Sequence, residues 1–186
     1  EQINEALREE DPLELVPSTD VEGHGTFLAS VACGSADPVH RFVGAAPESK
    51  IAVVKLKPAK DYLKAFYAIW PDALCYQEND IILGLAYLNR LAEQEQMPLV
   101  ICLAMGTNFG GHNGSTLLSA LLDTYAYTMD RAVVIGGGNE AANRHHFHHR
   151  FLENQESVTA EIRVGEGVAG FSAEIWARLP DVVTVA

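Results

Sequence analysis

Two short apolar runs, 98–103 and 132–135, constrain the fold of this chain more than any other feature. Each has the length and the aliphatic, β-branched composition of a strand that is buried on both faces. With a third such run at 50–56, these segments alternate with stretches whose apolar residues repeat at helical spacing. The alternation predicts a βαβ series, in which a parallel sheet is covered by helices on both faces through right-handed crossovers. The residues at helical spacing are Ile81, Leu85, Leu88 and Ala92 before the run at 98–103, and Leu118, Leu121, Leu122, Tyr125 and Met129 after it.

Glycine-rich segments follow the strands expected at 98–103 and 132–135. In a parallel sheet, the loops at the carboxyl ends of the strands form the functional site, so we expect these two segments to lie at it. We also expect Ser115 to cap the helix between the two strands. The glycine-rich segments are Ala104-Met105-Gly106-Thr107-Asn108 and Gly136-Gly137-Gly138-Asn139.

His24 stands between Gly23 and Gly25, directly before a small, apolar run that suits a helix. The glycines remove side-chain bulk on both sides of the ring, so that a substrate backbone can approach it. A helix beginning here would carry His24 in its first turn, where the positive end of the helix favours a neutral, proton-accepting imidazole. Taken alone, the same pattern also fits a histidine in a turn.

Composition excludes several classes of protein. Of the 186 residues, 48% are hydrophobic and 20% are charged, which fits one globular domain with part of a second rather than a disordered chain. The formal net charge of -12 argues against nucleic-acid binding, and no apolar run is long enough to cross a membrane. The three cysteines are far apart in apolar surroundings, which indicates buried side chains rather than a disulfide or metal framework.

Four short motifs occur in order along the chain: Gly-His-Gly-Thr at 23–26, Val-Gly-Ala-Ala-Pro at 43–47, Leu-Ala-Met-Gly-Thr at 103–107 and Gly-Gly-Asn-Glu at 137–140. In this order they resemble the central part of a subtilase, a subtilisin-like serine protease. The family's histidine motif usually reads His-Gly-Thr-His-Val-Ala-Gly, and this chain departs from it at Phe27 and Ser30. The segment 75–81 and the residues after Asn139 look closest to the clostridial Csp-type branch, which is similar to spore-germination proteases.

The chemistry of peptide hydrolysis by a serine requires a general base, a group that orients it, a nucleophile and donors for the oxyanion. His24 fits the base, and Asn139 fits an oxyanion donor, because its amide follows a buried strand beside glycines. The resemblance implies the same two roles, and the three-layer α/β fold of a subtilisin. Taken alone, Asn139 also fits a turn residue with a left-handed backbone.

The resemblance further implies where a protein or peptide substrate would bind, with no cofactor and no metal. The segment 104–106 would pair with the substrate main chain as a strand edge, with 136–138 opposite, and Asp20 would lie in a loop near the cleft. In the full-length chain its own pro-segment is a second expected partner, and a bacterial protein of extracellular or spore-associated location is implied. The expected substrate-binding residues are Asp20, Ala104, Met105, Gly106, Gly136, Gly137 and Gly138.

Two parts of the family's catalytic apparatus do not occur in this sequence. The catalytic Asp lies in an Asp-(Ser/Thr)-Gly setting upstream of the histidine, and Asp20 lacks that setting. No Gly-Thr-Ser-x-Ala string, which would supply the nucleophile, is present. The chain begins without Met or a signal sequence, so we interpret it as a piece of a longer protein that is inactive alone. An alternative is a pseudoprotease that keeps the fold as a binding or regulatory scaffold.

The pattern changes from about residue 156 onward. Apolar and polar residues alternate at 158–164 and 171–175, around a Gly-Glu-Gly turn at 165–167. This predicts antiparallel strands buried on one face, and the resemblance implies a jelly-roll-like insertion. We therefore expect a partial subtilase domain over 1–150 and the first strands of an inserted β-sandwich over 151–186. Unpaired edges of such strands would favour self-association.

Two further segments have alternative interpretations. The segment 145–149 has four histidines in five residues and suggests either a metal site or a polar loop. No Cys, Asp or Glu stands nearby at regular ligand spacing, which favours the loop. The triple glycine at 136–138 lacks the Gly-x-Gly-x-x-Gly spacing and a following basic or hydroxyl residue, which argues against nucleotide binding.

Overall fold

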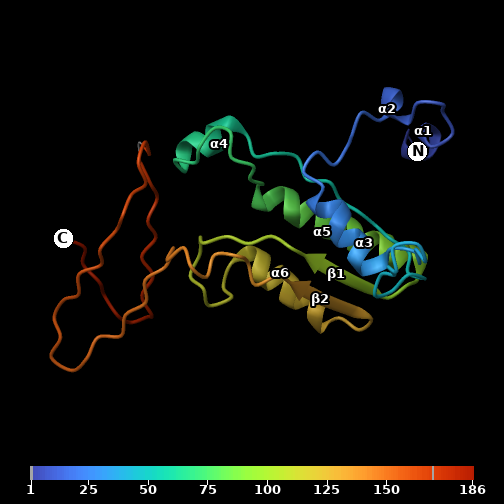
Figure 1. Cartoon of the computed structure of the whole chain (residues 1–186). Helices are drawn as coiled ribbons and strands as arrows, with labels where there is room; N and C mark the ends of the chain where they lie inside the picture. Colours follow the sequence, from blue (N-terminus) through green and yellow to red (C-terminus); the bar gives the residue numbers. More distant parts are fainter. Residues whose placement is uncertain (1, 169) are drawn as a thin grey trace. The chain divides into compact units, whose positions relative to one another are not determined.

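The computed structural model describes residues 2–168 and 170–186, and the chain divides into two units, Glu1–Val53 and Val54–Ala186. Figure 1 labels the helices and strands of both units. The expected domains 1–150 and 151–186 each include one residue outside the described residues, 1 and 169. The expected boundary near 150 stays a prediction.

The described part of the first unit has three helices, α1 (Gln2–Ala6), α2 (Pro12–Leu15) and α3 (His24–Cys33). Proline at the first position of α2 needs no hydrogen-bond acceptor, and the Asp11 carboxylate caps this helix by accepting the Leu13 N–H at 3.0 Å. Helix α3 confirms the helix expected after the histidine motif, with His24 as its first residue.

The segment 44–46 closes the C-terminal end of α3. Its backbone amides donate to carbonyls of the last turn and of the residue that follows the helix, which would otherwise lack partners. Gly44 is buried here, and a Cβ at this position would overlap the backbone of Gly34, so the close approach requires glycine. The bonds are Gly44 N–H to the Gly34 carbonyl (2.9 Å), Ala45 N–H to Val31 (3.0 Å) and Ala46 N–H to Ala32 (2.8 Å).

The described part of the second unit has three helices, α4 (Asp61–Phe66), α5 (Glu78–Glu95) and α6 (Leu117–Tyr127), and two strands, β1 (Leu99–Leu103) and β2 (Arg131–Ile135). The expected alternation of helix and strand is confirmed from residue 78 to 135. The short α4, in the aromatic stretch before residue 77, is not predicted by the sequence pattern. Figure 1 shows α5 leading into β1, and α6 connecting β1 to β2.

β1 and β2 pair in parallel, with Leu99 opposite Arg131 and Leu103 opposite Ile135. One face of this pair forms the core with α5 and α6, through the buried side chains of Leu85, Ile101 and Leu122. The side chains of Val100 and Val134, on the opposite face, are 68% and 56% exposed. Within the second unit, the described helices therefore cover one face of the sheet, where the sequence pattern predicts helices on both.

Helix α6 begins one residue later than the sequence suggests. Thr116 is the capping residue, and its hydroxyl oxygen accepts the Ser119 N–H at 3.1 Å. Ser115, the expected cap, instead donates its hydroxyl to Asn113 at 2.6 Å, so that prediction was wrong by one position. Both residues are good capping types, and the loop geometry decides between them.

Two expected groups of strands are absent from the described residues. The segment 50–56 has no regular secondary structure, and Ile51 and Val53 are more than half exposed. The described residues from 136 to 186 likewise contain no helix or strand, so the expected antiparallel strands after 156 are not confirmed. A strand exists only through hydrogen bonds to a neighbouring strand, and neither segment has one among the described residues.

None of the helices in the part of the chain that the structure describes is both long and apolar enough to span a membrane.

Candidate active site

The expected substrate segments 104–106 and 136–138 begin side by side, because both follow the carboxyl ends of paired strands. The Gly136 N–H donates to the Leu103 carbonyl at 3.1 Å, and a Cβ on Gly136 would lie 3.8 Å from the Ala104 Cα. Gly136, Gly137 and Gly138 are all exposed, and Gly137 and Gly138 have open space where a Cβ would be. The two loops therefore begin next to each other at the carboxyl end of the sheet, and their role in binding substrate stays a prediction.

The segment 104–106 directly follows β1 and has no partner strand among the described residues. Neither amides nor carbonyls in this segment hydrogen-bond to other described residues. Ala104 and Met105 are half-buried and Gly106 is exposed. A segment that follows a strand and has free main-chain groups can take a peptide as an additional strand.

Asn139 lies in the loop after β2, directly after Gly138, whose φ is +77°. Its side chain is exposed. The next residues form a turn, closed by the Asn143 N–H, which donates to the Glu140 carbonyl at 2.9 Å. The turn places Asn139 at the start of a folded loop, with its amide facing solvent and able to donate.

His24 is exposed at the first position of α3. Gly23, before it, has a φ of +74°, a left-handed conformation that glycine adopts without strain. None of the described residues hydrogen-bonds the His24 ring. The imidazole is therefore free to meet a substrate or a nucleophile from another segment.

Asp20 caps α3, a role that its position near His24 does not by itself predict. Its carboxylate accepts the Gly23 N–H (2.9 Å), the Thr26 N–H (2.8 Å) and the Thr26 hydroxyl (2.7 Å). These bonds replace the side-chain cap that Gly23 cannot provide. The hydroxyl bond from Thr26, followed by the two backbone bonds, holds the pKa of Asp20 below its usual value. Its expected contact with substrate stays a prediction.

His24 belongs to the first unit, and Asn139 and the loops after β1 and β2 belong to the second. Within the second unit, the structure places the beginnings of the loops after β1 and β2 side by side. That His24 and Asn139 face one cleft stays a prediction from the sequence.

The histidines at 145–149 contact different partners. His145 Nδ1 lies 2.7 Å from Glu140 Oε2, and His149 Nε2 lies 2.9 Å from Gln155 Oε1. The His149 ring also stacks on Phe147, with 6.2 Å between ring centroids. Within residues 2–168 and 170–186, no three His, Cys, Asp or Glu side chains are arranged to hold a metal ion.

Glu174 is a further residue near the loop after β1, and the sequence pattern gave it no role. Its carboxylate accepts the Gly110 N–H at 2.6 Å and the Trp176 indole N–H at 3.1 Å. The bond from Gly110, and then that from Trp176, lowers the pKa of Glu174 from its usual value. A contact over 64 residues carries no local sequence signal, so only the structure reveals it.

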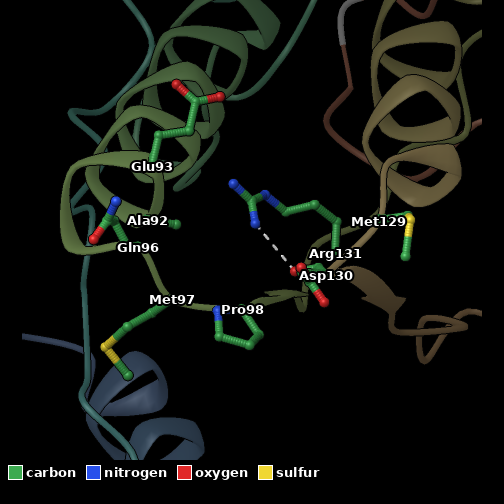
Figure 2. Close-up of a pocket in the computed structure, with 8 residues that line it drawn as sticks. All are labelled: Ala92, Glu93, Gln96, Met97, Pro98, Met129, Asp130 and Arg131. Carbon is green, nitrogen blue, oxygen red and sulfur yellow. Dashed lines mark hydrogen bonds between the residues drawn. The ribbon is translucent and has the colours of Figure 1, made fainter.

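A hollow of about 300 Å³ lies at the opposite end of the sheet, where β1 and β2 begin. Figure 2 shows its lining, in which the Arg131 guanidinium donates to the Asp130 carbonyl at 3.1 Å. The sequence-predicted site residues do not line it. It is formed by Ala92, Glu93, Gln96, Met97, Pro98, Met129, Asp130 and Arg131.

Comparison with known proteins identifies the family. The model of the subtilase family, peptidase S8, matches residues 3–164. Among solved structures, the CspB protease of Clostridium perfringens is similar at 32% sequence identity and a TM-score of 0.62. That match covers 76% of this chain and 28% of the protease chain, so the present chain corresponds to less than a third of it. None of the curated proteins matches.

The family match extends over the histidine motif, the strands and both glycine-rich loops. The resemblance seen in the ordered motifs, including that to the Csp-type branch, is confirmed by these two comparisons. The chain belongs to the subtilase family.

Proposed function

We propose that this chain is a central part of a Csp-type serine endopeptidase, in which His24 is the general base and Asn139 an oxyanion donor. His24 would accept the proton of a serine hydroxyl as it attacks the scissile carbonyl, and later give it to the leaving amine. The Asn139 amide would donate to the oxygen on which negative charge develops.

The unpaired main chain of 104–106 is the observation that carries this proposal. This segment follows β1 and begins beside the loop that starts at Gly136. Asn139 lies three residues after Gly136 in that loop. A substrate strand hydrogen-bonded along 104–106 would bring its carbonyls towards the loop that ends in Asn139. Holding the peptide in one register supplies the orientation that amide hydrolysis needs.

The remaining parts of the apparatus are assigned by the same proposal. Asp20 and 136–138 would line the substrate cleft, with Asp20 also holding the helix on which His24 stands. The chain as printed contains neither of the family's Asp and Ser motifs, so we expect it to hydrolyse no peptide by itself. The segment from 156 onward would complete its antiparallel strands in a jelly-roll-like insertion. An extracellular or spore-associated location, and the protein's own pro-segment as a partner, belong to the proposal.

The test uses the full-length protein that contains this chain, with peptide hydrolysis and pro-segment cleavage as the measurements. His24→Ala should abolish both. Asn139→Ala should lower kcat by roughly 100- to 1000-fold with little change in KM, because the lost bond forms mainly in the transition state. His40→Ala and Asn79→Ala are matched controls on exposed residues outside the proposed site, and both should keep the wild-type rate.

Unchanged pro-segment cleavage in His24→Ala would overturn the role given to this histidine. A wild-type protein that binds peptides without hydrolysing them would instead support the pseudoprotease scaffold.

A further inference from the structure

One ring nitrogen of His145 lies near two side chains, one of which requires a proton on it and the other a lone pair. Nδ1 lies 2.7 Å from Glu140 Oε2 and 3.2 Å from Asn108 Nδ2. An ionised carboxylate only accepts a hydrogen bond, so Glu140 requires a proton on Nδ1. The amide nitrogen of Asn108 only donates, so it requires a lone pair there. A single nitrogen cannot satisfy both.

The Glu140 contact is the stronger of the two. It is shorter, and one partner carries a charge, which makes such bonds about twice as strong as neutral ones. With the proton on Nδ1, rotation of the Asn108 amide by half a turn replaces its nitrogen with its oxygen. Both neighbours of Nδ1–H are then acceptors. This arrangement satisfies all three side chains.

The same carboxylate also organises the turn that follows Asn139. Glu140 Oε2 accepts the Asn143 side-chain N–H at 2.9 Å, in addition to the backbone bond that closes the turn. Asn108 lies two residues beyond Gly106, in the loop after β1. The cluster therefore connects the loop that carries Asn139 to the loop that carries the expected substrate strand.

We propose that Glu140 and His145 are positioning residues for Asn139. Glu140 keeps the proton on Nδ1 of His145, and this Nδ1–H, shared with the Asn108 oxygen, holds the loop after β2 against the loop after β1. The side chains of His145 and Glu140 are 49% and 54% exposed, so the pair contributes little to global stability. Its effect is on the position of the amide donor, where a displacement of about 1 Å can cost on the order of 100-fold in rate.

The first experiment needs no activity. Nitrogen-15 imidazole spectra of the full-length protein at alkaline pH report which ring nitrogen carries the proton, with His145→Gln identifying the signal. We expect the Nδ1–H form in the wild type and a shift towards the Nε2–H form in Glu140→Gln. The His146→Gln control should leave the His145 signals unchanged. An Nε2–H form in the wild type would overturn the proposal.

The second experiment rests on the proposed function and uses the full-length protein. His145→Gln and Glu140→Gln should each lower kcat by about 10- to 100-fold with KM little changed, whereas His146→Gln should not. Asn108→Asp, which keeps an oxygen towards Nδ1–H, should retain more activity than Asn108→Leu. If Asn139→Ala lowers kcat and the His145 and Glu140 variants do not, this inference fails and the proposed function stands. If Asn139→Ala has no effect, the proposed function fails, and the imidazole spectra alone decide on the pairing.

Discussion

At the scale of single residues, Asp20 both lies close to His24 in the sequence and caps the helix that begins at His24; the sequence predicts only the first of these. It lies four positions before His24, and its carboxylate holds the N-terminal turn that begins at that histidine. Its lowered pKa means that the folded state favours the charged form. The stabilisation is therefore complete above the unfolded pKa of about 4, and is lost as pH falls through the lower folded pKa.

We expect Asp20→Asn to remove this dependence on pH. At neutral pH the variant should unfold at a lower urea concentration than the wild type, and the amides of Gly23 and Thr26 should exchange hydrogen faster. The difference between the two proteins should shrink as pH falls below about 4, because the wild type then loses its charged cap as well.

Glu22→Gln is the matched control, since it removes a side-chain charge two positions away and keeps the Glu22 backbone N–H that also bonds Asp20. A constant difference between Asp20→Asn and the wild type at all pH values would contradict the capping role.

The sequence proposes candidate site residues, but it does not predict the hydrogen-bond partners around them. His24 and Asn139 are proposed as site residues from their glycine neighbours and from the order of the motifs, which the sequence alone provides. The bonds from Thr26 to Asp20, from Gly110 to Glu174 and from His145 to Glu140 depend on how loops close in space. Spacing along the chain does not contain that information, and for Glu174 the partners are 64 residues apart.

At the scale of secondary-structure elements, the beginning of α6 offers a test between two adjacent residues. Thr116→Ala removes the hydroxyl that accepts the Ser119 N–H and should destabilise the second unit by about 1 kcal/mol. Ser115→Ala removes a hydroxyl that donates to Asn113 and caps no helix amide, so a clearly smaller loss is expected. Urea unfolding of both variants, followed by far-ultraviolet circular dichroism, measures the difference. Equal losses would show that the two hydroxyls share the cap.

Helices and strands were predictable where the apolar pattern of a segment is matched by a neighbouring element against which it packs or pairs. Helices α5 and α6 and strands β1 and β2 each place an apolar stripe on the same core, around Leu85, Ile101 and Leu122. The run at 50–56 has an equally strong β-branched pattern, but no neighbouring strand among the described residues. Burial and pairing, rather than intrinsic preference, decide whether such a run becomes a strand.

At the scale of the whole molecule, exposed apolar surface and net charge act in opposite directions. On the face of the sheet away from α5 and α6, Val100 and Val134 are 68% and 56% exposed, which favours association with another chain. The net charge of -12 opposes it, and this repulsion weakens as pH approaches the isoelectric point of about 4.9 or as salt is added. We therefore propose that the chain self-associates, and that it does so more at pH 6 than at pH 8.

Sedimentation velocity over this pH range, at low and high salt, measures the effect. Val134→Lys should reduce association at every pH, because it places a charge on the apolar face. Tyr127→Lys is the control, since Tyr127 is 91% exposed at the end of α6 and outside that face. If both lysine variants reduce association equally, the added charge alone is responsible and the sheet face is not the contact. A chain that stays monomeric at pH 6 in high salt would show that the exposed apolar side chains drive no association.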